Sequence, residues 1–314
     1  MLISVAIPCY NSSKTLPLVV DEIRKSLSDK PEYDYEIVLV NDHSPDSTFE
    51  VIRDLCKNDS KIVGVDLSKN YGQASAQMAA INYVKGDIVV FMDDDGQHPA
   101  NEIFKLINKV EEGYDLVYAH FPQKMHSGFK RITSMLNSKV LELTNRKPKG
   151  INISSYFALS SFVVNSLRKY QSPFPSIGGY VLQITRKIAN VEVEHRARIE
   201  GTSNYNFKKL MRLWIQGLTN FSIVPLRIAS FAGIVSSIFG VIFGIVLIIR
   251  KLIYPNIAMG YTSLMAALLL IGGLIMMMLG LLGEYIGRIY IVLSNSPQYS
   301  VREVINNEES CDEK

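Results

Sequence analysis

Two long uncharged runs near the C-terminal end constrain this chain most. Residues 228–249 are 22 residues without a charged side chain, and residues 252–283 are 32. About 20 apolar residues form a helix long enough to cross a lipid bilayer. The two runs raise the mean hydropathy of the chain to +0.12, which is high for a water-soluble protein. The sequence therefore predicts spanning helices at 228–249 and 257–283, joined to a large water-soluble part.

Basic residues beside the two runs predict their orientation in a multi-pass membrane protein. Six of them flank the runs on the side of the water-soluble part, and two lie in the short connection between the runs. The six are Lys208, Lys209, Arg212, Arg227, Arg288 and Arg302, and the two are Arg250 and Lys251. Because positively charged flanks stay in the cytoplasm, we expect the water-soluble part, a tail at 284–314 and both termini to be cytoplasmic.

Short apolar runs alternate with amphipathic segments over residues 1–120. Runs of this kind predict buried strands, and the apolar spacing between them predicts helices. The expected strands are Leu2–Ile7, Glu36–Val40, Ile62–Val65, Ile88–Met92 and Leu116–Tyr118. Strands that alternate with helices form a mostly parallel sheet covered on both faces. We therefore predict an α/β, Rossmann-like domain over 1–205, in which ligands bind beyond the carboxyl ends of the strands.

The chain between 120 and 227 is less regular. We expect an extended segment near 154–160 and a helix near 179–188. From 206 to 227 the apolar residues form one helical stripe, with Lys208, Lys209 and Arg212 off the stripe. This pattern is typical of an amphipathic helix at the membrane interface, and equally of a helix packed against the domain.

The net charge of +3 conceals an uneven distribution. Residues 1–119 carry 11 basic and 20 acidic side chains (net −9), residues 120–227 carry 17 and 4 (net +13), and residues 228–314 carry 5 and 6 (net −1). A near-neutral chain is not expected to bind nucleic acid through bulk charge, so we expect no nucleic-acid partner. The basic part suits anionic lipid head groups and a single phosphate at the membrane.

The clearest candidate site is the acidic strand end Asp93-Asp94-Asp95. Three neighbouring carboxylates repel one another unless a cation lies among them. In an extended chain Asp93 and Asp95 point the same way, so the pair can hold Mg²⁺ or Mn²⁺ while phosphate oxygens take the open positions. An EF-hand is excluded because Phe91 would occupy its first ligand position. The remaining alternative is a solvated acidic turn that precedes the next helix.

Polar residues also follow three other expected strands. Asp42 follows the second strand, Gly72 follows the third, and Pro8 to Asn11 end the first. Gly72 permits close approach to the backbone. Each segment alone predicts only a turn, but four of them at successive strand ends predict one site.

These residues resemble those of the inverting family 2 glycosyltransferases of GT-A fold. The motifs that carry the resemblance are Pro8-x-Tyr10-Asn11, Asp42, Asn70-x-Gly72-Gln73 and Asp93-x-Asp95-x-Gln97. A later segment is similar to the dolichol-phosphate-mannose-synthase-like branch and, within it, to bacterial polyprenyl-phosphate glycosyltransferases. That segment reads His195-x-x-Arg198-x-x-Gly201-x-Ser203-x-Tyr205, followed by Phe221-Ser222, Pro225-Leu226-Arg227 and the two spanning runs. The resemblance covers nearly the whole chain except the acidic tail.

The resemblance implies a role for each matching residue. The nucleobase and ribose would lie against Pro8, Tyr10, Asn11 and Asp42, and the nucleotide-binding set would also include Asn70, Gly72, Gln73 and Asp94. Asp93, Asp95 and Gln97 would surround the metal, Mg²⁺ or Mn²⁺, and the diphosphate. Arg198 would contact phosphate with Ser203 beside it, and Lys130, Arg131 and Ser134 would lie in the acceptor loop. Asp93, Asp95 and Arg198 would thus be the catalytic residues.

The resemblance implies a metal-dependent enzyme that transfers a sugar, with inversion, from a nucleotide-sugar to a polyprenyl phosphate. By analogy the donor would be a UDP-sugar and the acceptor of the undecaprenyl type, at the cytoplasmic membrane face, for cell-envelope glycans. A homo-oligomer, a tetramer, is implied as well. Because the acceptor is already anionic near neutral pH, no strong general base is needed. We therefore interpret His98 and His195 as hydrogen-bonded bystanders.

Two departures from the resemblance, both on the acceptor side, leave alternatives open. Asn204 stands where relatives often have Lys, and residues 152–159 replace an Asp-rich stretch followed by Phe-Arg-Leu-Leu. The donor-side motif is intact, although Gly96 replaces a usual Leu. The acceptor could therefore be another lipid or a lipid-linked saccharide. A membrane scaffold that binds nucleotide-sugar without turnover is the third hypothesis.

Overall fold

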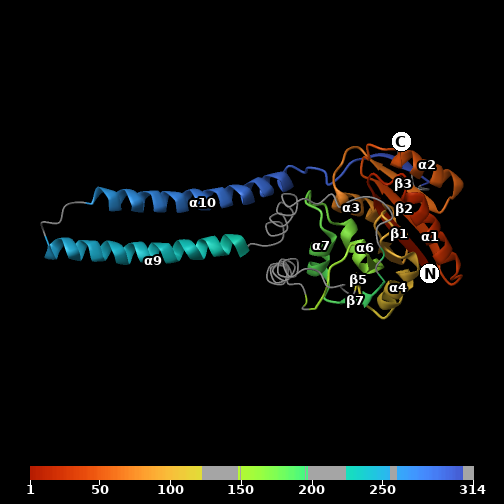
Figure 1. The fold of residues 1–314 in the computed structure, drawn as a ribbon, viewed down its shortest axis with the longest axis horizontal. Helices are drawn as coiled ribbons and strands as arrows, with labels where there is room; N and C mark the ends of the chain where they lie inside the picture. The colour runs from red at the N-terminus through yellow and green to blue at the C-terminus, as the bar shows by residue number, and fades with distance from the viewer. Residues whose placement is uncertain (122–147, 149, 195, 197–223, 255–259, 307–314) are drawn as a thin grey trace. The chain divides into compact units, whose positions relative to one another are not determined.

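The computed structural model describes residues 1–121, 148, 150–194, 196, 224–254 and 260–306. The chain forms two units. The first comprises residues 1–205 and 297–314, and the second comprises residues 206–296. Figure 1 traces the elements of each unit along the chain.

In the described part of the chain, an eight-stranded sheet forms the centre of the first unit. Its strand order is β7-β5-β6-β4-β1-β2-β3-β8, and β6 and β8 run antiparallel to the other strands. The strands are β1 (Leu2–Cys9), β2 (Asp34–Asn41), β3 (Ile62–Leu67), β4 (Ile88–Phe91), β5 (Leu116–His120), β6 (Phe157–Ser160), β7 (Ile188–Glu192) and β8 (Val301–Ile305). The five expected strands are β1 to β5, so the predicted mostly parallel α/β fold is confirmed.

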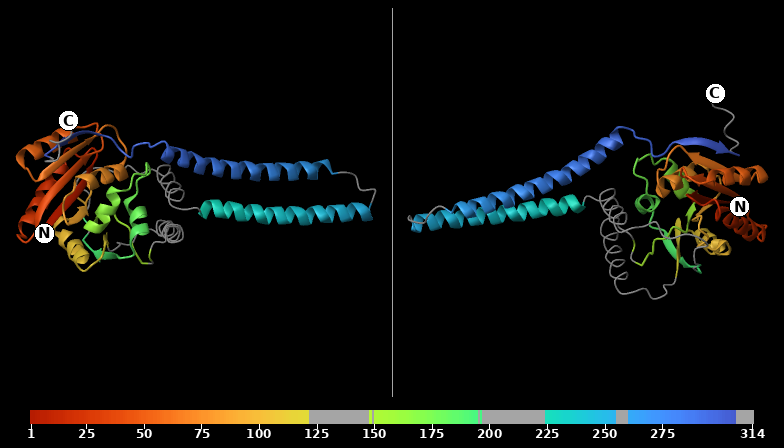
Figure 2. Two further views of the ribbon diagram at one scale, coloured as in Figure 1. Left: turned by 180° about the vertical axis from the view of Figure 1, so that it is seen from behind. Right: turned by 45° about the horizontal axis from the view of Figure 1, so that its top comes forward.

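Helices cover both faces of the sheet, as the alternating pattern predicts (Figures 1 and 2). Along β1, Ile3 and Val5 pack on one face and Ala6 packs on the other. The first face is covered by α1 (Leu16–Ser28), α2 (Thr48–Asn58) and α4 (Ile103–Glu111), which the short 3-10 helix η1 (Ala100–Glu102) precedes. The second face is covered by α3 (Gln73–Tyr83), α6 (Ser161–Arg168) and α7 (Ile177–Ile184).

The region near 154–188 departs in part from expectation. The extended segment is confirmed as β6. The helix expected near 179–188 is α7, which begins earlier and ends at Ile184, because Thr185 takes an extended backbone with φ −138° and ψ 160°. Residues 188–192 form β7 instead and pair with β5.

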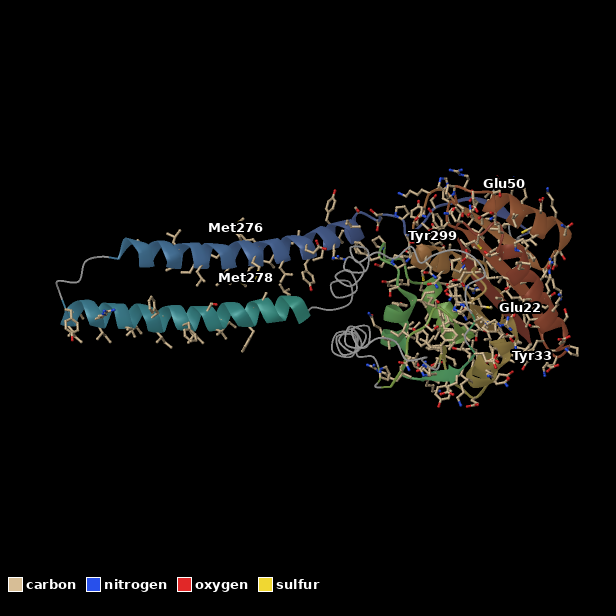
Figure 3. The ribbon with its side chains drawn as sticks, in the orientation of Figure 1. Glu22, Tyr33, Glu50, Met276, Met278 and Tyr299 are labelled. Atoms are coloured by element: carbon tan, nitrogen blue, oxygen red, sulfur yellow. The ribbon has the colours of Figure 1, made fainter. Side chains whose placement is uncertain are left out.

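The second unit contains two long helices, α9 (Val224–Ile253) and α10 (Tyr261–Leu293). By length and composition both could cross a membrane, with apolar windows at Ala229–Val246 and Leu270–Leu293. At 1.5 Å per residue the uncharged stretch 228–249 extends about 33 Å, close to the hydrocarbon thickness of a bilayer. A Cβ on Gly233 would lie 3.3 Å from Met278 Cε. Figure 3 shows Met278 directed toward α9 and Met276 directed away from it.

Regular structure continues beyond residue 284, where we expected the tail to begin. α10 continues to Leu293, and Arg288 Nη2 lies 2.6 Å from Glu284 Oε1 one helical turn away, a spacing that stabilises a helix. Residues 301–305 then form β8, which pairs with β3 at the edge of the sheet. This part of the expected tail therefore belongs to the first unit.

Candidate active site

The carboxyl ends of β4, β1, β2 and β3 lie at one edge of the sheet because these strands are parallel neighbours. Polar residues follow each strand. Tyr10 and Asn11 follow β1, Asp42 follows β2, residues 68–73 follow β3, and residues 93–97 follow β4. Hydrogen bonds cross from one strand end to the next, so the structure brings these predicted site residues together.

Asp42 holds the loop that follows β3. Its Oδ1 accepts a hydrogen bond from Tyr71 N (2.7 Å) and its Oδ2 from Gly72 N (2.8 Å). Burial raises the pKa of Asp42, and the two backbone hydrogen bonds oppose this shift. Gly72 has φ +90° and ψ 158°, a conformation essentially restricted to glycine. The glycine therefore permits the turn that places Gln73 at the start of α3.

Asp93 is held from two sides by neutral donors. Gln73 Nε2 donates to Asp93 Oδ1 (2.8 Å), and Ser155 Oγ donates to Asp93 Oδ2 (2.6 Å). Ser155 reaches the carboxylate because β4 and β6 are antiparallel with Phe91 opposite Phe157. If this register is continued for two residues beyond Phe91, Ser155 lies opposite Asp93. The orientation of the Asp93 carboxylate is thus fixed by one side chain from α3 and one from the segment that precedes β6.

His98 is part of the loop structure. It is buried, its Nδ1 accepts a hydrogen bond from Asp93 N (3.0 Å), and its ring stacks on Tyr156 at 4.8 Å between centroids. Its Nε2 lies 3.7 Å from Asp93 Oδ2. These contacts give His98 a structural role in the loop. They support its interpretation as a hydrogen-bonded residue that transfers no proton.

Asp94 fixes the backbone that follows β1. Its Oδ2 accepts a hydrogen bond from Tyr10 N (2.9 Å). Burial raises the pKa of Asp94 to about 6, and the hydrogen bond from Tyr10 N acts in the opposite direction. Asn11 takes φ +57° and donates its N–H to Ser44 Oγ (3.1 Å). Tyr10 remains 43% exposed as a residue, and an exposed aromatic ring can stack on a nucleobase.

Asp93 and Asp95 are the carboxylates that could hold a divalent cation. Among the residues that the structure describes, no group of three or more His, Cys, Asp and Glu side chains is placed to bind a metal. Two carboxylates still fit Mg²⁺ or Mn²⁺, because such ions are commonly held by one or two carboxylates and complete their coordination with phosphate oxygens and water. Gln97 supports this loop through its backbone N, which donates to Asp95 Oδ1 (3.0 Å). A metal contact by the Gln97 side chain stays a prediction.

Two family models match the chain. The model for glycosyl transferase family 2 matches residues 4–167, just over half of the chain and all four strand ends. The chain belongs to glycosyl transferase family 2. A second model, the GtrB C-terminal hairpin, matches residues 224–289 of this glycosyltransferase, which include α9 and most of α10.

Relatives of similar length are also glycosyltransferases. The undecaprenyl-phosphate 4-deoxy-4-formamido-L-arabinose transferase of Proteus mirabilis (strain HI4320) is 33% identical over 309 residues, which cover 96% of this chain and 94% of the relative. The SfII prophage-derived bactoprenol glucosyl transferase of Shigella flexneri is 31% identical over 304 residues, which cover 96% of this chain and 98% of the relative. The predicted branch of the family is thereby confirmed.

A solved structure supports the fold of this glycosyltransferase. Glucosyl-3-phosphoglycerate synthase from Mycobacterium tuberculosis, in complex with Mn²⁺, UDP and glucosyl-3-phosphoglycerate, matches with a TM-score of 0.52 and 23% sequence identity. The match covers 69% of this chain and 77% of that one. The likeness confirms the GT-A-like architecture.

Several residues assigned by resemblance lie outside the described residues, and their roles stay predictions. They are Lys130, Arg131, Ser134, His195, Arg198, Ser203 and Asn204, together with residues 206–223 of the expected amphipathic helix. Two further assigned residues are described: Pro8 lies within β1 opposite Val40, and Asn70 directly precedes Tyr71 in the loop.

Ser155 is a site residue that sequence reasoning missed. It lies in the segment 152–159, which stood out only as a departure from the family resemblance. The signal that could have identified it is register: an antiparallel strand beside β4 must bring its first residues to the acidic strand end.

Proposed function

We propose that this glycosyltransferase moves a sugar from a UDP-sugar to a polyprenyl phosphate of the undecaprenyl type, with inversion. The observation that carries the proposal is the hydrogen-bonded cluster in which Asp93 and Asp94 meet residues from the ends of β1 and β3. The names of the Proteus and Shigella relatives support a polyprenyl acceptor. The Mn²⁺ and UDP in the complex of the Mycobacterium synthase support a UDP-sugar donor and a divalent cation.

In this proposal the donor lies along the carboxyl edge of the sheet. The exposed ring of Tyr10 stacks on the nucleobase, and the loop held by Asp42 lies against the ribose and phosphates. Asp93 and Asp95 would hold Mg²⁺ or Mn²⁺, which would supply positive charge to stabilise the departing diphosphate. Gln73 and Ser155 keep the Asp93 carboxylate oriented before the donor arrives.

The acceptor supplies its own nucleophile. A phosphate monoester is largely dianionic near neutral pH, since its second pKa is about 6. One of its oxygens forms a bond to the anomeric carbon while the bond from that carbon to the diphosphate oxygen breaks, so attack from the opposite face inverts the centre. No proton has to be removed by the protein, which agrees with the structural role of His98.

The membrane arrangement is part of the proposal. α9 and α10 cross the cytoplasmic membrane, and the catalytic domain and both termini are cytoplasmic. The support is the length and composition of the two helices and the excess of basic residues on the domain side of the runs. The enzyme acts as a homo-oligomer, which the family resemblance implies.

Transfer by the purified full-length protein tests this function. The protein is incubated with undecaprenyl phosphate, Mn²⁺ or Mg²⁺, and a panel of radiolabelled nucleotide-sugars, and the chloroform-soluble label is counted. We expect one donor to yield a lipid-linked sugar that mild acid releases, as for a sugar phosphate linkage. Asp95→Ala should lower the rate at least 100-fold, whereas Asp54→Ala, the same change at an exposed position on α2, should leave it unchanged.

The outcomes separate the hypotheses. An acid-stable glycosidic product on another lipid would show a different acceptor. Metal-dependent nucleotide binding without any product would show a scaffold. If no donor labels lipid and Asp95→Ala binds nucleotide like the wild type, the proposal is wrong.

A further inference from the structure

Strand β8 contains an extra residue beside the candidate active site. In its pairing with β3, Leu67 lies opposite Val301 and Asp66 lies opposite Glu303. One step along β3 therefore corresponds to two steps along β8, and Arg302 is the additional residue of a β-bulge. Bulges of this kind redirect a side chain and are enriched next to active sites.

The redirected side chain contacts the first residue of the loop that follows β3. Arg302 Nη2 donates a hydrogen bond to Ser68 O (3.1 Å), and Ser68 N donates to Ser300 O (2.9 Å). Both backbone polar groups of Ser68 are thus held by the segment around the bulge. Arg302 is exposed, and its guanidinium adds a charged side-chain donor to the backbone contact at Ser68.

Ser68 begins the loop that carries three contacts of the site. Tyr71 N and Gly72 N donate to Asp42, and Gln73 donates to Asp93. The loop is therefore fixed at its far end by the strand ends of β2 and β4 and at its near end by β8. A shift at Ser68 would change the positions of the backbone groups that the proposed donor approaches.

The segment before β8 is attached independently of Arg302. Gln298 Nε2 donates to Ser172 O (2.8 Å), and Asn82 Nδ2 of α3 donates to the hydroxyl of Tyr299, a residue labelled in Figure 3. At the other end of β8, Asn306 Nδ2 donates to Cys56 O (2.6 Å). Loss of the Arg302 side chain should therefore leave β8 in place.

We propose that Arg302 is a positioning residue for the nucleotide-sugar site, and that β8 couples the segment after α10 to the loop at residues 68–73. The inference rests on the proposed function. It deepens that function because it assigns a role in donor binding to residues that follow the membrane hairpin in the chain, where we had expected only a tail.

The test measures donor binding by the full-length protein in detergent. Binding of UDP with Mn²⁺ is followed by calorimetry for the wild type, Arg302→Ala, Arg302→Lys and Glu303→Gln. Glu303→Gln is the matched control. Glu303 lies next to Arg302 on β8, but its side chain pairs with Arg53 of α2 (3.0 Å). We expect Arg302→Ala to raise the Kd for UDP about three- to tenfold, Arg302→Lys to restore much of the affinity, and Glu303→Gln to leave it unchanged.

Kinetics separate positioning from general damage to the fold. In Arg302→Ala the KM for the nucleotide-sugar should rise, while the KM for polyprenyl phosphate and the melting temperature stay near the wild-type values. An unchanged Kd for UDP in Arg302→Ala, or an equal rise of that Kd in Glu303→Gln, would refute the role of Arg302 and leave the proposed function standing. A wild-type protein that binds no nucleotide would instead refute the proposed function and this inference together.

Discussion

One of the two donors that hold the Asp93 carboxylate is a hydroxyl from the segment that precedes β6. Ser155 Oγ donates to its Oδ2 while Gln73 occupies its Oδ1. Ser155→Ala removes the first donor and allows the carboxylate to rotate out of the metal-binding orientation. A hydrogen bond to a charged group contributes about 1.5–3 kcal/mol, so we expect kcat/KM in the transfer assay to fall roughly ten- to hundredfold.

The control for this substitution is Ser166→Ala. Ser166 lies on α6, where its hydroxyl donates to Phe162 O within the same helix. Its loss should leave kcat/KM within about twofold of the wild type. Equal activity of the two variants would contradict the role given to Ser155.

Two thiols in the catalytic domain should be unreactive in the folded protein. Burial raises the pKa of Cys9 well above its usual value, with a further contribution from the charge of Asp94, and burial raises the pKa of Cys56 to about 12. The thiolate is the reactive species. At pH 8, iodoacetamide should therefore modify Cys9 and Cys56 only after denaturation, as mapped by mass spectrometry. Rapid modification of Cys9 in the native protein would show that the strand end opens.

At the scale of one element, the loop between β3 and α3 depends on Gly72. An alanine there would have open space, but its backbone would be strained at φ +90°, at a cost of about 1–3 kcal/mol. We expect Gly72→Ala to lower the melting temperature and also to weaken UDP binding, because the strain is relieved by moving the N–H that contacts Asp42. Both quantities are measured on the purified protein.

Gly113→Ala provides the comparison, since Gly113 also has a positive φ (+100°) and open space, at the end of α4. It should lower the melting temperature without weakening UDP binding. Parallel losses of affinity in both variants would mean that global stability, and not the loop, controls binding.

Some strands can be predicted from the local sequence and others cannot. β1 and β4 are buried on both faces; β4 is a continuous apolar run, and β1 is one that only Ser4 interrupts before Pro8, which is why both were predicted. β8 has the charged residues Arg302 and Glu303 within five residues and contacts Ser68, which lies 234 positions earlier. A short edge strand with so distant a partner leaves no local pattern. The contacts of Asp42 with the backbone of the next loop likewise require the folded geometry.

At the scale of the whole molecule, charge divides the chain. The acidic region 1–119 contains the strand ends, and the basic region 120–227 precedes most of the two long apolar helices α9 and α10. This division and the positive flanks predict the orientation of the chain in the membrane.

An epitope inserted after Tyr254, between α9 and α10, should be cleaved by protease added to intact spheroplasts. Epitopes at the two termini should be cleaved only after lysis, and cleavage of a terminal epitope in intact spheroplasts would contradict this topology.

The central claim is that the carboxyl edge of the sheet binds a nucleotide-sugar together with a divalent cation, and a thermal-shift measurement tests it most directly. A ligand at 100 times its Kd stabilises the folded state by about 2.7 kcal/mol, which corresponds to a rise of roughly 5–10 °C for a domain of this size. We predict that rise for the wild type with UDP-sugar and Mn²⁺, its loss when EDTA is added, and its absence in Asp95→Ala. An equal rise without the metal ion, or in Asp95→Ala, would contradict the account.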